Sequence, residues 1–499
     1  MTTADLITSL LQQAVGLQQQ GHFGQAEDLY LKVLHAQPDN FDAMHLLGVI
    51  ARQTGRPALA LELVSRAIGI NPLQANAHCN LGAALQDLDR PLDALACYDE
   101  AIRLQQGYAV ALNNRGNTLR RLSRHEEALA SYRQAIEARP SYAEAHNNLG
   151  AVLHTLRRHD EALLSYQRAL QWNPAFADAL NNLGITLHAL HDFDSALASY
   201  DRVLQLQPGR ADAWCNRGMA LQKLRHFQHA VSSYDRALNI DARFAGAHLG
   251  RANSLRSLER NEEAVAGYLQ AMECGADAEQ VNYALAALGV VAAPAASPGA
   301  YVRELFDQYA GHFDSHLQQN LQYRTPALLM DLLRPHLPAA ALDIVDLGCG
   351  TGLCGALLKA YAGRLDGVDI SPAMLEQAKQ KKCYDSLACV DIGEFLRRCE
   401  CRYGLAVAAD VFVYIGDLSD TFAAAGKVLK EGGLFAFSVE ESEQEDIVLR
   451  ASRRFAHSPA YLQKTAEAHG FVIDEMAREV IRQDNGADVH GCLVVMHRL

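Results

Sequence analysis

The residues best suited to do chemistry stand close together in the segment 346–352, where an aspartate is followed by three glycines at alternate positions. An apolar run at 341–345 precedes this segment and predicts a buried strand, and residues 353–361 have helical spacing. A strand, a glycine-rich turn and a helix in this order can bind an anionic group with the free N–H groups of the turn and the helix start. Asp346 would repel a pyrophosphate but attract an ammonium group, so the pattern favours a ligand in which an amino acid is joined to a nucleoside.

The three glycines of this segment have separate tasks. Gly348 and Gly350 permit the turn and a close approach of the backbone to a ligand, and Gly352 permits tight packing of the following helix. Together with Asp346 they resemble motif I of the class I methyltransferases that depend on S-adenosylmethionine (SAM). The resemblance implies that these four residues bind SAM. Another mononucleotide-binding α/β protein is the alternative.

Acidic residues also end the next two predicted strands. Residues 365–370 form the second strand and place Asp369 at a spacing suited to bind both ribose hydroxyls of a nucleoside. Residues 387–392 form the third strand, and the resemblance implies that Asp391 binds the adenine amino group while the next residue flanks the ring. The predicted cofactor-binding residues are Asp346, Gly348, Gly350, Gly352, Asp369, Ile370, Asp391, Ile392 and Asp410.

The catalytic residues are less clear than the cofactor site. The fourth predicted strand, 405–412, is followed by Tyr414. It lacks the N/D-P-P-Y signature of many methyltransferases that act on amino groups or on DNA. This region is more similar to small-molecule methyltransferases, such as those of ubiquinone biosynthesis. Residues 301–317 resemble the opening segment of a bacterial group of predicted methyltransferases that also carry repeats, and an N-terminal helix often covers the cofactor in such enzymes. Tyr309, His312 and Tyr414 are therefore candidate catalytic residues; packing for the tyrosines and a surface position for the histidine are the alternatives.

The N-terminal half repeats with a period of 34 residues. One column of the repeat holds glycine, a second holds alanine and a third holds tyrosine in all repeats but one. The glycines are Gly48, Gly82, Gly116, Gly150, Gly184 and Gly218. This pattern resembles eight tetratricopeptide (TPR) repeats over about 7–278, each a pair of short helices in which the small residues let the two helices approach.

A fourth column of the array bears on binding. Asparagine stands two residues before the glycine in five successive repeats, at Asn80, Asn114, Asn148, Asn182 and Asn216. Similar arrays, notably that of O-GlcNAc transferase, line their groove with such asparagines. An asparagine amide can bond both the C=O and the N–H of an extended peptide, so the column predicts a groove for a protein or peptide. The alternative is that these side chains only tie one repeat to the next.

Composition limits the function further. The net charge is −13 and neither half has a basic surplus, which argues against a nucleic-acid partner. The eleven cysteines form no C-x-x-C pair, so we expect a reducing compartment and no metal site. We find no signal peptide and no apolar run long enough for a membrane span, and we expect a cytoplasmic protein.

These patterns predict an all-α TPR superhelical solenoid followed by an α/β class I methyltransferase domain with a seven-stranded Rossmann-like sheet. The expected boundaries are 1–280 for the array, 281–298 for a linker, 299–340 for a helical cap and 341–499 for the catalytic domain. The first functional hypothesis is a SAM-dependent methyltransferase whose array recruits a protein substrate or partner. The alternatives are a small-molecule methyltransferase whose array serves assembly, and a SAM-binding scaffold without turnover.

Overall fold

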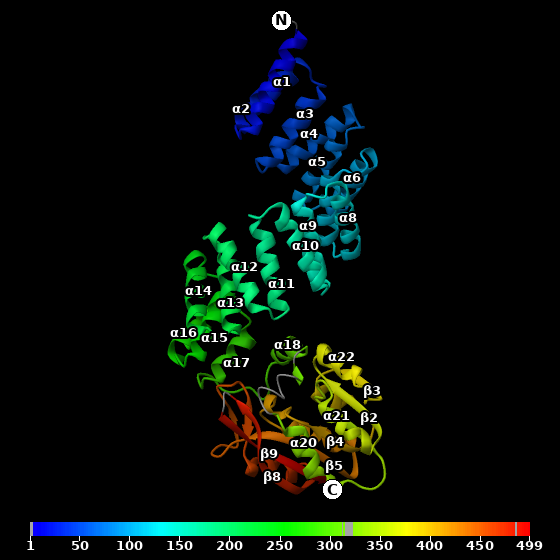
Figure 1. Ribbon diagram of the computed structural model, residues 1–499, viewed down its shortest axis with the longest axis vertical. Helices are drawn as coiled ribbons and strands as arrows, with labels where there is room; N and C mark the ends of the chain where they lie inside the picture. The colour runs from blue at the N-terminus through cyan, green and yellow to red at the C-terminus, as the bar shows by residue number, and fades with distance from the viewer. Residues whose placement is uncertain (1–2, 312, 315–322, 485–486) are drawn as a thin grey trace. The chain divides into compact units, whose positions relative to one another are not determined.

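The computed structural model describes residues 3–311, 313–314, 323–484 and 487–499 (Figure 1). The chain forms two compact units, Met1–Ala242 and Arg243–Leu499. The first is entirely helical in its described part. The second begins with helices and continues into an α/β sheet domain.

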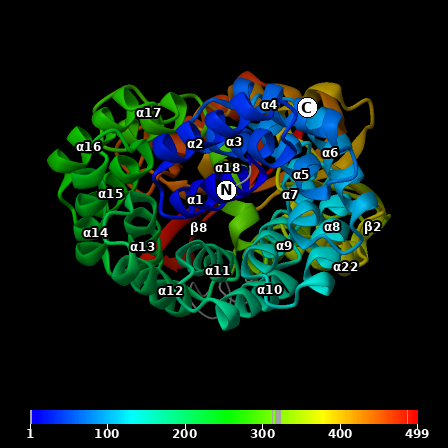
Figure 2. The same cartoon turned by 90° about the horizontal axis from the view of Figure 1, so that it is seen from above.

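Unit 1 is a series of antiparallel helix pairs that follow one another along a curved path (Figure 2). In each pair the second helix packs along the first, and the first helix of the next pair packs on the second. The helices are α1 Thr3–Gln19, α2 Phe23–Ala36, α3 Phe41–Gln53, α4 Pro57–Ile70, α5 Ala75–Asp87, α6 Pro91–Leu104, α7 Ala109–Arg121, α8 His125–Ala138, α9 Ala143–Thr155, α10 His159–Trp172, α11 Ala177–Ala189, α12 Phe193–Leu206, α13 Ala211–Lys223 and α14 Phe227–Ile240.

The glycine and tyrosine columns explain why each pair is so close. A Cβ atom on Gly82 of α5 would lie 2.8 Å from the ring of Tyr98 in α6, and one on Gly150 of α9 would lie 2.7 Å from the ring of Tyr166 in α10. Such distances leave no room for a methyl group, so the first helix of a pair must expose bare backbone to the tyrosine of the second. The tyrosines are fully or almost fully buried. The predicted reason for the small residues is thus confirmed in the five pairs from α5–α6 to α13–α14.

Unit 2 opens with three helices, α15 Ala245–Ser257, α16 Asn261–Glu273 and α17 Ala278–Ala286. In the α15–α16 pair the glycine column holds Ala252, and the facing helix supplies Gly267 instead, whose Cβ would lie 3.1 Å from the Cβ of Ala252. The two helices are therefore still in close contact, but the glycine lies on the second helix of this pair and not on the first. Helix α17 extends into the segment 281–298, where we expected a linker, so only the later part of that segment lacks helical structure.

The sheet of unit 2 has the strand order β3-β2-β1-β4-β5, continued by β9 and β8. Strands β1 to β5 are parallel to one another and β9 is antiparallel to β5, which is the seven-stranded sheet expected from the sequence. A short hairpin of β6 and β7, which we did not predict, pairs with the end of β5. The strands are β1 Leu342–Leu347, β2 Ala362–Asp369, β3 Ser386–Cys389, β4 Tyr403–Ala408, β5 Leu429–Glu441, β6 Ile447–Leu449, β7 Phe455–His457, β8 Phe471–Asp484 and β9 Ala487–Arg498.

Helices cover both faces of this sheet, because its buried strands present apolar side chains alternately to each side. In β4, Leu405 and Val407 join a core with α20 and α21, whereas Ala406 and Ala408 join an aromatic core with α24 and α25. The remaining elements are α18 Gly299–Tyr309, α20 Thr325–Leu333, η1 Arg334–His336, α21 Leu353–Leu358, η2 Lys359–Tyr361, α22 Pro372–Gln380, α23 Ile392–Arg398, η3 Phe412–Tyr414, α24 Ser419–Val428 and α25 Pro459–Ala468. Among the described residues, no helix is long and apolar enough to cross a bilayer.

Candidate cofactor site

The glycine turn between β1 and α21 has the backbone conformation that its sequence predicts. Gly348, Gly350 and Gly352 have φ angles of +68°, +53° and +87°, which favour glycine. A Cβ atom on Gly348 would lie 2.5 Å from Val411, just after β4, and one on Gly352 would lie 3.0 Å from the ring of Tyr384. The turn is thus held between two neighbouring segments, with its backbone directed at the end of the sheet.

Asp346, the acid that precedes the turn, is buried and only 1% exposed. The hydroxyl of Tyr384 donates a hydrogen bond of 2.6 Å to its Oδ2 atom. Burial raises the pKa of Asp346 to about 7, and the hydrogen bond from Tyr384 opposes this rise. Sequence analysis missed Tyr384, which lies in the short connection between α22 and β3 and carries no motif.

Asp369, at the end of β2, is oriented by backbone groups. Its Oδ2 accepts from the N–H of Gly350 at 2.9 Å, and its Oδ1 accepts from the N–H of Ser371 at 2.8 Å. Burial raises the pKa of Asp369, while these two backbone hydrogen bonds favour the charged form. Asp391 begins α23 as its N-cap, where Oδ1 accepts from the N–H of Glu394 at 3.0 Å.

A single cavity of about 330 Å³ brings these positions together. It lies at the carboxyl ends of β1, β2, β3 and β4, where open α/β sheets bind their ligands. Of the predicted cofactor-binding residues, only Gly352 is not part of its lining. Those that line the cavity are Asp346, Gly348, Gly350, Asp369, Ile370, Asp391, Ile392 and Asp410.

Helix α18 and the residues just after it form another wall of the cavity. Phe306 and Phe313 both line it and lie edge to face, with ring centroids 6.0 Å apart. Asp307 accepts a 2.6 Å hydrogen bond from the hydroxyl of Ser371, and Asp314 bonds to Thr351 of the glycine turn. The segment that we expected to form a cap therefore contacts the glycine turn and the loop after β2.

The three candidate catalytic residues differ in position. Tyr414 lines the cavity, is buried, and has its pKa raised by that burial to about 12. Tyr309 is 41% exposed and does not belong to the cavity lining. His312 lies outside the described residues. Of the three, the described structure brings only Tyr414 to the cavity.

Asp410 has a distinct environment. Its φ of +58° is left-handed, an uncommon backbone conformation for a residue other than glycine. Its carboxylate accepts from Arg482 at 3.2 Å and lies 3.8 Å from Arg454, so it faces arginines of the sheet edge. Arg454 also lines the cavity and was not anticipated, because it belongs to the unpredicted hairpin.

The segment expected as a linker supplies one more wall. The carbonyl of Ala295 accepts from the N–H groups of Gly416 at 2.8 Å and Asp417 at 3.1 Å, and the N–H of Ser297 donates to the carbonyl of Tyr414 at 2.8 Å. Both Ala295 and Ser297 line the cavity. We call residues 295–297 the strap. Its sequence of small residues gave no signal for this pairing.

The asparagine column lies apart, on α5, α7, α9, α11 and α13 of unit 1. Asn148, Asn182 and Asn216 each donate to the Oδ1 of an asparagine one helix pair earlier, at 3.0 to 3.2 Å. Asn80 bonds His45 and Asn114 contacts Cys79 in the same way. The column therefore does tie neighbouring pairs together, and the prediction of a peptide groove stays a prediction.

Fold and site together define a TPR array joined to a class I methyltransferase domain. The family model described as "Methyltransferase domain" matches residues 345–435. Models described as "TPR repeat" or "Tetratricopeptide repeat" match residues 11–75, 75–108, 116–156, 158–191 and 183–257. The chain thus contains TPR repeats and a methyltransferase domain.

Two similar proteins are named as methyltransferases. The chain is 31% identical over 137 residues to the malonyl-[acyl-carrier protein] O-methyltransferase of Acetivibrio thermocellus, covering 27% of this chain and 47% of that protein. It is 41% identical over 93 residues to methyltransferase-like protein 27 of Homo sapiens, covering 18% and 37%. The chain thus spans less than half the length of these two relatives.

One solved structure that is similar to part of this chain is a TPR protein. The crystal structure of YrrB, described as a TPR protein with an unusual peptide-binding site, is 28% identical, with a TM-score of 0.33 and coverage of 38% of this chain and 96% of that chain.

Proposed function

We propose that this protein is a SAM-dependent methyltransferase and that SAM binds in the cavity over the glycine turn. The supporting observation is that one cavity collects the acidic residues at the ends of three parallel strands, Asp346, Asp369 and Asp391, around a turn of bare backbone. The polar groups around this cavity fit those of SAM. A buried carboxylate suits an ammonium, the N–H groups of the turn suit a carboxylate, and the acid at the end of β2 suits ribose hydroxyls.

The cofactor would supply an activated methyl group, so the protein has to align the acceptor and exclude water. Phe306, Phe313 and Tyr414 give the cavity an apolar aromatic wall suited to this task. Tyr414 is protonated at neutral pH, as an ordinary tyrosine is, and burial raises its pKa further, to about 12. It is thus suited to orient an acceptor by a hydrogen bond and unsuited to remove a proton from it.

We further propose that the array recruits a protein substrate or partner, with the asparagine column as part of the recognition surface. The bonds between neighbouring pairs use one N–H of each amide in Asn148, Asn182 and Asn216. Peptide recognition would use the carbonyl oxygen and the second N–H, which an amide has in addition. The two roles of the column are therefore compatible.

A second candidate function is methylation of a small acidic molecule, with the array serving assembly. Three guanidinium groups, of Arg450, Arg454 and Arg482, lie beside the carboxylates of Asp410 and Glu440. Arg454 is the member that lines the cavity beside Tyr414. Such a site suits an acidic acceptor, and the Acetivibrio relative acts, by its name, on a malonyl group.

The test follows a labelled methyl group. The purified full-length protein is incubated with methyl-labelled SAM and a lysate of its own host, and Asp369→Ala is the control that should transfer no label. Label in protein bands supports the recruitment of a polypeptide, and label only in small molecules supports the second candidate. SAM binding without any transfer would support a SAM-binding scaffold, and absence of SAM binding would overturn the proposal.

A deletion experiment separates the two candidates in a second way. Removal of residues 1–278 would cut away α15 and α16, which belong to the same compact unit as the catalytic domain. Removal of residues 1–242 keeps that unit intact. A metabolite enzyme should keep its turnover after this shorter deletion, whereas an enzyme that recruits a protein through the array should lose it.

A further inference from the structure

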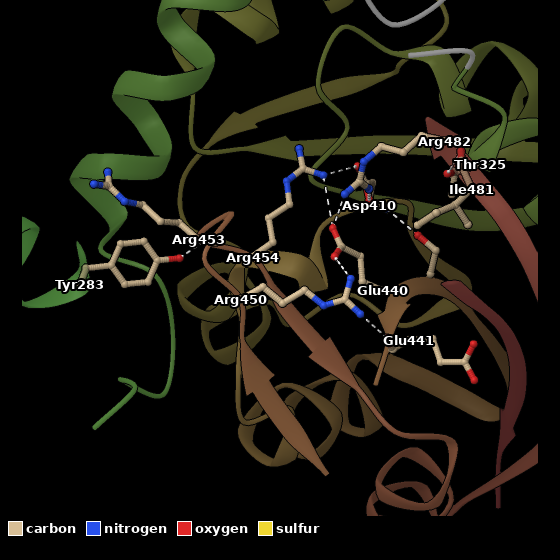
Figure 3. A network of polar contacts seen from close by, with 11 residues as sticks. Tyr283, Thr325, Asp410, Glu440, Glu441, Arg450, Arg453, Arg454, Ile481 and Arg482 are labelled. Carbon is tan, nitrogen blue, oxygen red and sulfur yellow. Dashed lines mark hydrogen bonds and ion pairs between the residues drawn. The ribbon is translucent and has the colours of Figure 1, made fainter. Parts of the chain in front are cut away.

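The turn of the β6–β7 hairpin places two adjacent arginines in different surroundings. Arg453 has a left-handed φ of +62°, and its N–H donates to the carbonyl of Arg450 at 2.8 Å, which closes the turn. Figure 3 shows the side chains of Arg453 and Arg454 leaving this turn in different directions. This divergence brings two separate parts of unit 2 to a single short turn.

Arg453 binds the last helix pair of the array. Its Nη2 donates to the Oδ1 of Asn253 in α15 at 2.8 Å and to the hydroxyl of Tyr268 in α16 at 3.2 Å. Arg256 of α15 donates in turn to the carbonyl of Ala451 in the same turn, at 2.6 Å. Arg453 is 8% exposed, so these are buried contacts of a charged group, which are costly to break.

Arg454 extends instead to the cavity wall. It lies 3.8 Å from Asp410 and 3.6 Å from Glu440, and its guanidinium lies 5.9 Å from the centre of the Tyr414 ring. The hairpin thus places Arg454, which lines the cavity, directly after Arg453, which binds the last helix pair of the array.

Tyr283 of α17 joins this turn to the strap. Its hydroxyl donates to the carbonyl of Arg453 at 2.6 Å (Figure 3). The same hydroxyl lies 2.7 Å from the hydroxyl of Ser297. Ser297 bonds in turn to Tyr414 of the cavity wall. Two routes therefore run from α15–α17 to the cavity, one through Arg453 and one through Tyr283 and Ser297. The hydroxyl of Tyr283 contacts both, because it bonds to the carbonyl of Arg453 and lies beside Ser297.

We infer that Arg453 and Tyr283 are positioning residues by which helices α15–α17 set two walls of the cavity, the strap and Arg454. The inference adds a regulatory role to the proposed methyltransferase site. The positioning itself does not depend on the proposed function, but its effect on ligand binding does. Because coupling between two sites is reciprocal, a partner that shifts α15–α17 would change ligand binding in the cavity, and a ligand in the cavity would restrain α15–α17.

The test is amide hydrogen exchange in the full-length protein without ligand. In Tyr283→Phe the N–H groups of Ser297, Gly416 and Asp417 should exchange about tenfold faster. The reason is that loss of one well-ordered hydrogen bond lowers the free energy of local opening by an amount equivalent to about a tenfold change in exchange rate. Gly416 and Asp417 are informative because their N–H groups donate to Ala295 and not to Tyr283. The matched control is Tyr234→Phe, which removes a buried hydroxyl bonded to Gln222 in unit 1 and should leave these three amides unchanged.

Two further measurements separate positioning from a loss of overall stability. Exchange in the central strands β1 and β4 should remain as in the wild type, and Arg453→Lys should restore most of the protection that Arg453→Ala loses, since an ammonium can also donate to Asn253 and Tyr268. Faster exchange throughout the sheet, or rates at Gly416 and Asp417 within twofold of the wild type in Tyr283→Phe, would overturn the inference.

The consequence is tested with S-adenosylhomocysteine as the probe. In the wild type, its binding should slow exchange in α17, and Tyr283→Phe should lose this distant effect while keeping protection of the glycine turn. Absence of binding in calorimetry would refute the proposed function, and the exchange rates of the ligand-free protein would then decide the inference by themselves. Binding without any change in α17 would refute the regulatory role.

Discussion

Replacement of Tyr384 by phenylalanine should weaken SAM binding at neutral pH and hardly affect it at pH 9. The ring of Tyr384 packs on the glycine turn and on Gly355, and its hydroxyl donates to the buried carboxylate of Asp346. Phenylalanine keeps the ring and removes only that hydrogen bond. The change therefore acts on the charge of Asp346 more than on packing.

The magnitude follows from the pKa of Asp346, which burial raises to about 7 in the protein without ligand. At pH 7 about half of the molecules then carry the charged form that an ammonium requires. A hydrogen bond to a charged group stabilises it by about 1.5–3 kcal/mol, which corresponds to about 1–2 pKa units. Its loss would raise the pKa of Asp346 to roughly 8–9 and reduce the affinity about 5–50-fold at pH 7, but at most about twofold at pH 9.

The assay is calorimetry of S-adenosylhomocysteine binding between pH 6 and pH 9. The result is expressed as the ratio of the variant's dissociation constant to that of the wild type at each pH. The titration of the ligand itself affects both constants equally and therefore cancels in this ratio. The control is Tyr403→Phe, which removes a hydroxyl bonded to the buried Asp366 in β2, away from the cavity. An equal loss of affinity at every pH would refute the reasoning, because it would show that Tyr384 acts through packing. A wild-type affinity that does not rise from pH 6 to pH 8 would show that Asp346 is already charged.

Three further predictions concern the cofactor site and the array. Asp369→Ala should weaken SAM binding at least about tenfold while leaving the thermal midpoint of the catalytic unit within a few degrees of the wild type, and unchanged affinity in calorimetry would remove the assignment. Gly150→Ala should destabilise the array by about 1–3 kcal/mol in urea unfolding, because its Cβ would lie 2.7 Å from the ring of Tyr166, whereas Gly69→Ala, with no atom within 4 Å, should leave the array unchanged or slightly more stable. Burial lowers the pKa of His188 to about 4, whereas the unfolded chain binds this proton near pH 6.5. The array should therefore lose stability as the pH falls from 6.5 towards 4, by at most about 2 kcal/mol at pH 5. Urea titrations at pH 6.5 and pH 5 should show that His188→Leu removes this part of the loss.

The features that sequence analysis predicted are those in which one short stretch, or one repeated position, determines the structure. The 34-residue period fixes the helix pairs because Gly150 and its equivalents need a tyrosine sixteen residues later, and both are visible in one repeat. The glycine turn and the acids in or just after β1, β2 and β3 are likewise local, since a parallel sheet brings the carboxyl ends of its strands together.

What the sequence could not reveal depends on contacts between distant segments. Tyr384 reaches Asp346 across 38 positions of the chain, and no motif marks a tyrosine before a strand. Arg454 gains its place in the cavity from a hairpin whose two strands have three residues each, too short to show periodicity. The strap has the composition of a linker because its residues are small and uncharged, and such residues reveal nothing of the backbone pairing that holds them.

The glycine and tyrosine contact has a consequence for how the length of this protein can vary. The five helix pairs from α5–α6 to α13–α14 each close through this contact, so each is a self-contained block of 34 residues that can be duplicated or removed in register. The last pair is different, because Asn253 and Tyr268 also hold Arg453 of the catalytic domain. Growth or shortening of the array by whole blocks is therefore expected before Arg243, and chimaeras that exchange arrays between proteins should be joined at that residue.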